Sequence, residues 1–230
     1  NEFSRLAWQG IVAIDLLDKK LHEIRPYEKH CGETNYVYQH YLQQVFNYIK
    51  GKKELTGLLR NALRDFENIS IEKGVQKPVI GIVGEIYIRS NQFSNENIVG
   101  QIESLGGEAW LPPIGEWILY TNFTALRRTW ENRSWSNLLK TFITNIYQKF
   151  DEHHLSKIFA PRLKNYPEPS TKQTIRNAQP YLDPTFEGEA ILSIGKVVDF
   201  IRKGVHGIIN VMPFTCMPGT IVTTLLKKLR

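Results

Sequence analysis

The chain has 230 residues, 42% of them hydrophobic, and a formal net charge of +6. This length and composition allow a substantial hydrophobic core and exclude a disordered chain. The longest apolar runs are far shorter than the roughly 18 residues that a membrane span requires, so we expect no transmembrane segment.

The first part of the chain is expected to be helical. Apolar residues recur at helical spacing in three stretches, which predict amphipathic helices over residues 4–24, 35–50 and 55–66. The sequence opens directly on the first of them, without a signal peptide or an initial methionine. We therefore interpret it as a fragment whose residues 1–74 form an N-terminal helical unit.

The pattern then changes to strands alternating with helices, over residues 75–230. Short apolar runs predict buried strands at residues 78–83, 108–111 and 207–212. Helices are expected at residues 96–105, 116–130, 135–150, 189–202 and from about 219 onward. A proline-rich stretch over 161–184 predicts a long loop with a short helix near 172–177.

This alternation predicts an α/β fold, in which a parallel sheet is flanked by helices in the Rossmann or flavodoxin-like manner. Ligands of such sheets bind beyond the carboxyl ends of the strands. We therefore expect a site among the loops 84–94, 111–115 and 213–220.

The loop after the first strand supplies polar candidates for catalysis, namely Glu85, Arg89 and Asn91. A carboxylate that follows a buried strand needs a partner, and Arg89 is the nearest cation in sequence. Such a pair is structural more often than catalytic. A further pair of acids, Glu187 and Glu189, is expected to favour the N-terminus of the helix that follows.

The loop after the last strand carries Cys216 and is followed by a helix. Backbone amides at a helix N-terminus point to where an anion or a thiolate would lie, so Cys216 is a candidate low-pKa thiolate, of the kind that ligates metals or reacts. Thr215, Gly219 and Thr220 are the candidate binding residues around it. The alternative is that Cys216 is a small buried hydrophobic residue, as free cysteines commonly are.

Several chemistries are not indicated. The chain contains no GxGxxG, GxxxxGK[ST], GxSxG or HExxH motif, which argues against a self-sufficient ATPase or hydrolase. Its two cysteines are far apart in sequence, so neither a disulfide framework nor a zinc site is predicted, and a reducing cytoplasm fits best. The basic residues are scattered, which argues against nucleic acid as a partner.

Three segments together resemble a known family. They are RPYE with GET at residues 25–34, VIGIVGEIYIR at 79–89, and the stretch from EGEA at 187 to GIINVMPFTCMPGT at 207–220. The chain is similar to the dehydratase-subunit-like region of proteins related to 2-hydroxyacyl-CoA dehydratases and acyl-CoA dehydratase activases. The similarity covers nearly the whole chain.

The resemblance implies an iron–sulfur redox function. Proteins of this kind hold a cluster through cysteines from different domains and receive electrons from an ATP-driven activator. Cys216 matches a late cluster cysteine, whereas Cys31 falls in no ligating motif. Because a cluster normally takes about four thiolates, the resemblance implies that the other ligands lie outside this segment, which would be inactive alone. It also implies an ATPase activator module and an acyl-CoA as partners.

A second hypothesis assigns the chain to another functional class. It is a non-catalytic α/β interaction or scaffold module of a large CoA-enzyme activator, with Cys216 inert. Iron and sulfide content of the complete protein, purified without oxygen, discriminates between the two.

Overall fold

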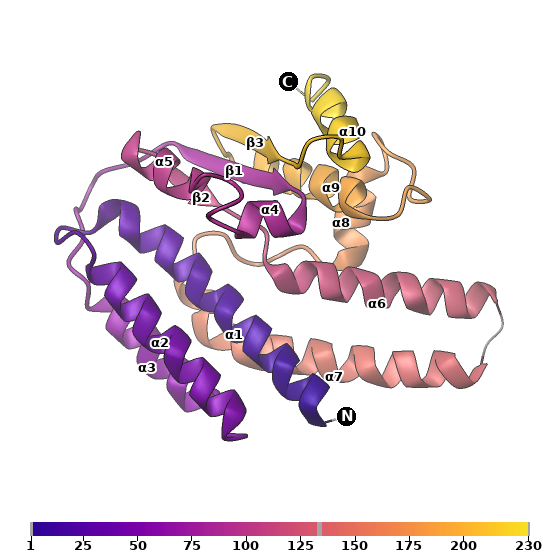
Figure 1. The fold of residues 1–230 in the computed structure, drawn as a ribbon, viewed down its shortest axis with the longest axis horizontal. Helices are drawn as coiled ribbons and strands as arrows, with labels where there is room; N and C mark the ends of the chain where they lie inside the picture. Colours follow the sequence, from indigo (N-terminus) through magenta and orange to yellow (C-terminus); the bar gives the residue numbers. More distant parts are fainter. Residues whose placement is uncertain (1, 133–134, 230) are drawn as a thin grey trace. The chain divides into compact units, whose positions relative to one another are not determined.

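The computed structural model describes residues 2–132 and 135–229, which form two compact units (Figure 1). The helical unit comprises Asn1–Val75 and Pro113–Tyr166. The sheet unit comprises Gln76–Pro112 and Pro167–Arg230. Each unit has its own hydrophobic core.

The helical unit is built around its first helix. Its elements are α1 (Glu2–Ile24), η1 (Arg25–Tyr27), α2 (Glu33–Lys50), α3 (Thr56–Glu67), α6 (Ile114–Glu131), α7 (Trp135–Phe159) and η2 (Ala160–Arg162). α1 packs against α2, α3, α6 and α7. Its Leu17 is completely buried, together with Leu59 and Phe66 of α3 and Phe159 of α7. The three predicted N-terminal helices are thus present, each within two residues of its expected start.

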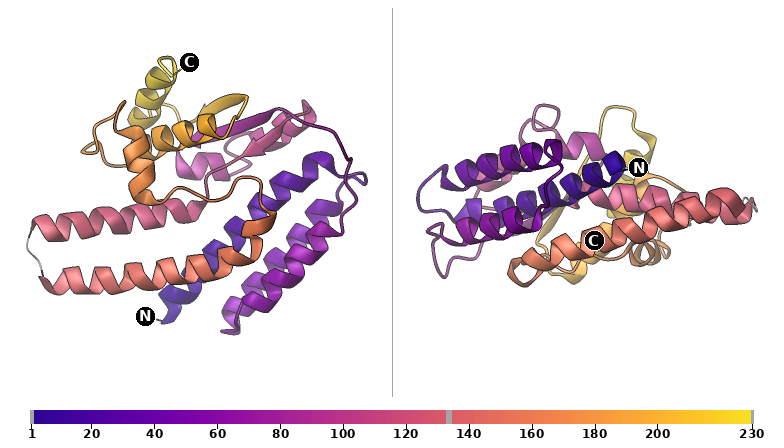
Figure 2. Two further views of the ribbon diagram at one scale, coloured as in Figure 1. Left: turned by 180° about the vertical axis from the view of Figure 1, so that it is seen from behind. Right: turned by 90° about the horizontal axis from the view of Figure 1, so that it is seen from below.

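Helices α6 and α7 belong to the helical unit and not to the α/β part, where the sequence analysis placed them. They run side by side in opposite directions (Figure 2). Ile118 and Leu119 of α6 and Leu155 of α7 pack on the core around α1. An amphipathic pattern shows that a helix has a face to bury, but it does not show which layer covers that face.

The sheet unit contains a small parallel sheet. Its elements are β1 (Val79–Gly84), α4 (Ile86–Ser90), α5 (Ile98–Ser104), β2 (Glu108–Trp110), α8 (Thr171–Ala178), α9 (Glu189–Arg202), β3 (Gly207–Val211) and α10 (Met217–Leu226). The strand order is β2-β1-β3, and both pairings are parallel. The prediction of three parallel strands is therefore confirmed.

Helices cover both faces of this sheet. Ile82 of β1 packs with Val99 and Ile102 of α5 on one face. Val83, the next residue, packs with Val197 and Phe200 of α9 on the other. Successive side chains of a strand point to opposite faces, so a continuous apolar run is what a strand buried on both sides requires.

The loops differ from the sequence prediction in two places. Residues 86–90, expected as loop, form the short helix α4, because the Glu85 carboxylate accepts a hydrogen bond from the Ile88 amide at 2.7 Å and caps it. α10 begins at Met217 rather than near Gly219. Pro218 lies in its first turn, where a missing amide hydrogen costs nothing.

Within the described residues, no helix has both the length and the apolar character needed to cross a membrane.

Candidate functional site

The candidate site lies at the carboxyl edge of the sheet, where β1 and β3 end next to each other. Gly84 pairs with Val211 at the end of the β1–β3 ladder, and the Glu85 amide donates to the Val211 carbonyl at 3.0 Å. Because the two strands are parallel, the chain leaves both of them at the same edge. The segment 85–91 and the segment 212–220 therefore start from neighbouring points.

Gly84 permits this close approach. It has a φ of +119°, and a Cβ atom placed there would lie 2.0 Å from the Val211 carbonyl oxygen. No L side chain fits that space or readily adopts that φ. Gly84 thus allows the segments 85–91 and 212–220 to begin close to each other.

Cys216 is the N-cap residue of α10, as the strand–loop–helix pattern suggested. Its Sγ accepts a hydrogen bond from the Gly219 amide at 3.4 Å, and its side chain is partly exposed. Its amide donates to the Pro213 carbonyl at 3.2 Å, which closes a turn over residues 213–216. The sulfur is thus held at the positive end of a helix, in a residue that is partly exposed.

Thr215 is held in a strained conformation directly before the cysteine. Its φ is +66°, which is uncommon for a β-branched residue and costs on the order of 1–3 kcal/mol. Thr220 is a helical residue whose hydroxyl donates to the Cys216 carbonyl at 2.9 Å. Gly219 is buried, and a Cβ there would lie 2.4 Å from the Met212 sulfur. The three candidate binding residues thus shape the loop around Cys216.

The polar candidates at the end of β1 are engaged in local structure. Asn91 donates to the Tyr87 hydroxyl at 3.0 Å and accepts from the Ser94 amide at 2.9 Å, so it closes the turn after α4. Glu85 serves as the cap of α4. The side chain of Arg89 is buried.

Glu189 is the acidic residue that sequence reasoning undervalued. It was expected only to favour the N-terminus of α9, but its carboxylate also accepts from the Ile86 amide at 3.1 Å. Burial raises the pKa of Glu189 and the nearby Glu85 carboxylate adds to the rise, whereas the Ile86 amide and Arg89 oppose it. Glu85, Arg89 and Glu189 therefore form one electrostatic group, which their separation in sequence conceals.

The described residues hold no group of three or more His, Cys, Asp or Glu side chains arranged to bind a metal ion. Cys31, the second cysteine, is exposed and belongs to the helical unit. The sheet unit therefore offers Cys216 as a single thiol ligand, and the residues present do not complete a cluster site.

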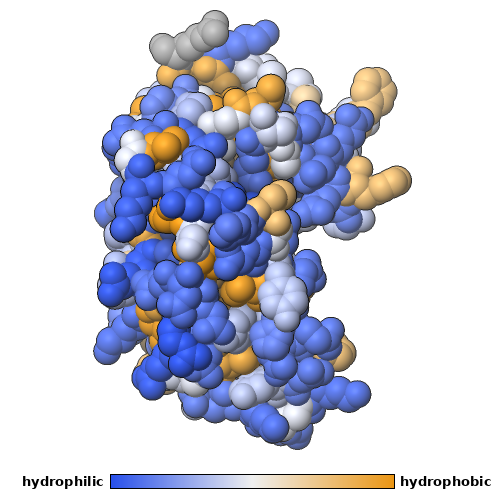
Figure 3. Space-filling model, turned by 90° about the vertical axis from the view of Figure 1, so that its left-hand side faces the viewer, coloured by the Kyte–Doolittle hydropathy of each residue, from blue (hydrophilic) through white to orange (hydrophobic). Residues whose placement is uncertain are grey.

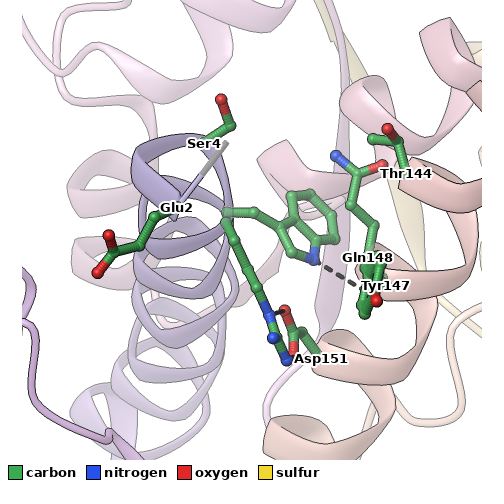
Figure 4. Close-up of a pocket in the computed structure, with 8 residues that line it drawn as sticks. Glu2, Ser4, Thr144, Tyr147, Gln148 and Asp151 are labelled. Carbon is green, nitrogen blue, oxygen red and sulfur yellow. Dashed lines mark hydrogen bonds and ion pairs between the residues drawn. The ribbon is translucent and has the colours of Figure 1, made fainter. Parts of the chain in front are cut away.

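The helical unit contains a cavity of its own. It has a volume of ≈ 390 Å³ and lies between the start of α1 and the middle of α7. Arg5 makes two hydrogen bonds of 2.7 Å to the buried Asp151, and the Trp8 indole donates to the Gln148 carbonyl (Figure 4). Arg5, Asp151 and Trp8, which line this cavity, thus already have hydrogen-bond partners within the chain.

In comparisons with known proteins, the chain matches no family model, no curated protein and no solved structure.

Proposed function

We propose that the chain is a segment of an iron–sulfur redox protein of the 2-hydroxyacyl-CoA dehydratase and activase kind, to which it contributes one thiolate, Cys216. The placement of this cysteine carries the proposal. Cys216 is a partly exposed residue at a helix N-terminus, beside the carboxyl edge of a parallel sheet. Ligands of parallel sheets bind at that edge.

The strained backbone beside the cysteine supports a function there. A threonine at φ +66° has a cost in stability, and such strain is concentrated at functional sites. The strand order β2-β1-β3 supports the finer, flavodoxin-like classification of the sheet, because it corresponds to the first three strands of that order.

The proposal requires partners. Since a cluster takes about four ligands and this chain offers one suitable cysteine, the remaining thiolates come from another polypeptide segment. When bound, the cluster would supply low-potential electron transfer, with electrons delivered by an ATPase activator module. The role of this chain is to hold one sulfur at a fixed position, and an acyl-CoA is the proposed substrate of the assembled system.

The alternative, a non-catalytic interaction module, is favoured by the apolar surroundings of the same edge. Phe93 after α4 and Phe214 before Cys216 are almost fully exposed, at 95% and 96%. Exposed aromatic residues are characteristic of protein-binding surfaces. In this alternative a protein covers the edge and Cys216 acts only as a helix cap.

Replacement of each cysteine by serine tests the proposal. Serine is a preferred N-cap residue, so Cys216→Ser should preserve α10 while it removes the iron ligand. In the complete protein, purified or reconstituted with iron and sulfide without oxygen, we expect Cys216→Ser to lose most cluster iron and its visible absorption. The matched variant Cys31→Ser should retain both.

Circular dichroism and thermal unfolding of the two variants serve as controls for folding. Retention of the full iron and sulfide content by Cys216→Ser would show that the cysteine is structural and would favour the interaction module.

A further inference from the structure

Helix α7 carries a row of large apolar side chains that are open to solvent. The row, here called the α7 stripe, comprises Leu139, Phe142, Ile143, Ile146, Tyr147 and Phe150. Each of the six is between 44% and 62% exposed. Successive members are either adjacent in sequence or three residues apart. This spacing follows the helical repeat, so all six lie on one side of the helix.

The opposite side of α7 is already buried in the helical unit. Asn145, Asp151 and Leu155 on that side are each less than 9% exposed. The Gln148 carbonyl accepts from Trp8 of α1, and its side chain accepts from Asn122 of α6. The described part of α7 thus has two sides that carry apolar residues: one is buried within the helical unit, and the other, the α7 stripe, is about half exposed. A helix with apolar residues all round is normally covered on all sides.

Isolated exposed hydrophobic residues need no explanation, but a continuous row does. On the face of the molecule shown in Figure 3, hydrophobic residues lie in separate small patches between hydrophilic ones. In contrast, the α7 stripe extends over three helical turns without a charged residue among its six members.

We propose that the α7 stripe is the contact between two copies of this chain, which pair face to face about a two-fold axis. In a two-fold contact the same surface lies on both sides, so it must be self-complementary. An uncharged apolar stripe meets this requirement, because no like charges come to lie opposite each other. Leu139, Ile143, Ile146 and Phe150 also follow the alternating four-and-three spacing by which paired helices interlock.

The available area agrees with a dimer. If an aromatic side chain offers about 200 Å² of surface and an aliphatic one somewhat less, six that are half exposed leave at most about 600 Å² on each copy. The pair would then bury at most about 1,200 Å² in total, at the lower end of specific protein interfaces. This area indicates a reversible dimer rather than an obligate one.

One residue of the stripe also borders the cavity of the helical unit. Tyr147 lines it, and the Arg5 guanidinium lies 5.4 Å from the centre of the Tyr147 ring. Because Arg5 is itself held by the buried Asp151, Tyr147 lies against a fixed neighbour. The cavity beside it provides a recess for a side chain of the second copy, and rigid aromatic residues beside pockets are typical of interface centres.

Sedimentation velocity over a range of protein concentrations tests the proposal. The wild-type chain should show a monomer–dimer equilibrium. Ile143→Lys places a charge at the centre of the stripe and should weaken the dimer roughly 30-fold or more. The matched control Leu105→Lys changes a residue that is 87% exposed and distant from α7 in sequence, and it should leave the equilibrium unchanged.

Far-ultraviolet circular dichroism checks that both variants fold. If Ile143→Lys does not fold, Tyr147→Ser, which removes the aromatic ring beside the cavity, replaces it with the same expectation. A wild-type chain that stays monomeric at every concentration overturns the proposal, as does a folded stripe variant that dimerises like wild type. Co-sedimentation of the monomer with anionic lipid vesicles, lost in the stripe variant, would instead assign the stripe to a membrane surface and would equally overturn the dimer.

Discussion

Asp15 is a buried carboxylate that joins two helices of the helical unit. It lies on α1, and its two oxygens accept hydrogen bonds from the Ile114 and Gly115 amides of α6 at 2.9 and 2.8 Å. These amides are at the start of α6, where the helix has no acceptors of its own. Asp15 therefore acts as a cap supplied from a distant part of the chain.

Burial raises the pKa of Asp15 to about 7, although the two amides oppose the rise. A carboxyl group whose pKa is raised on folding stabilises the fold below its unfolded pKa, and this contribution is lost as the pH rises through the folded pKa. Asp18 acts in the same direction, because burial raises its pKa to about 6. His22 acts in the opposite direction, because burial lowers its pKa to about 3.

We expect Asp15→Asn to remove part of this pH dependence. Asparagine cannot titrate, and it retains one acceptor for the α6 amides. Between about pH 4.5 and pH 7.5, wild type should lose stability relative to the variant by on the order of 1 kcal/mol per pH unit. Chemical unfolding of both proteins at each pH measures this difference. The contribution of His22 cancels in it, and that of Asp18 cancels apart from its charge interaction with Asp15. A constant difference across the range would contradict the expectation.

The sequence contained no sign of this role. Asp15 lies in the predicted first helix between Ile14 and Leu16, at a position that gives no indication of a partner about one hundred residues later. The position of Cys216 at a helix N-terminus was more predictable, because it depends on the few residues that follow it. The cap that Glu85 provides is equally local, but residues 86–90 were expected to be a loop, so this role was not predicted. Local hydrogen bonds leave a sequence pattern, whereas tertiary ones do not.

Helix α9 is the most deeply buried element of the sheet unit. Its Lys196 is completely buried, where it pairs with Glu168, and its Nζ lies 3.8 Å from Asp199. Gly195, the residue before it, lies so close to α8 that an added Cβ would be 2.2 Å from the Thr174 carbonyl oxygen. The α8–α9 contact thus depends on the absence of a side chain at position 195.

Gly195→Ala should therefore destabilise the sheet unit, although alanine is the better helix former. Overpacking of this kind costs about 1–3 kcal/mol, against a gain in helix propensity of about 1 kcal/mol. Gly57→Ala in α3 is the matched control, since a Cβ there meets nothing within 4 Å and should be neutral or stabilising. Denaturant unfolding measures the free energy of unfolding of each variant relative to wild type. If Gly195→Ala is as stable as wild type, α8 moves aside without cost and the prediction is wrong.

Helix boundaries were predictable where local sequence signals set them, and were not where tertiary packing does. The α9 boundaries, Glu189–Arg202, agree with those predicted, because acidic residues precede the helix and glycine follows it. α7 continues to Phe159, well beyond the predicted end at residue 150. Its last turns are stabilised by the burial of Leu155 and Phe159 in the core, which the local pattern does not reveal.

On the scale of the whole molecule, the chain passes between its two units three times. The boundaries fall near residues 75, 112 and 166. The first agrees with the division at 74 and 75 drawn from the change in periodicity. The other two could not be derived, because α6 and α7 are amphipathic helices that could equally have covered a sheet.

Hydrogen exchange should show two separate protected centres. In the helical unit we expect the slowest amides in the middle of α1, which packs against four helices. In the sheet unit we expect them in β1, because it is the central strand and Ile82 and Val83 are completely buried. Exchange measured by mass spectrometry should rank β1 as slower than β3, an edge strand. Faster exchange in β1 than in β3 would contradict the arrangement of the sheet.

The capping role of Cys216 has a genetic consequence. Serine caps a helix at least as well as cysteine does, and a single nucleotide substitution converts either cysteine codon into a serine codon. The stability of helix α10 therefore does not prevent the replacement of Cys216 by serine. If capping were the only role of position 216, serine would be common there in related genes. A cysteine kept through evolution would mean that selection acts on the sulfur itself.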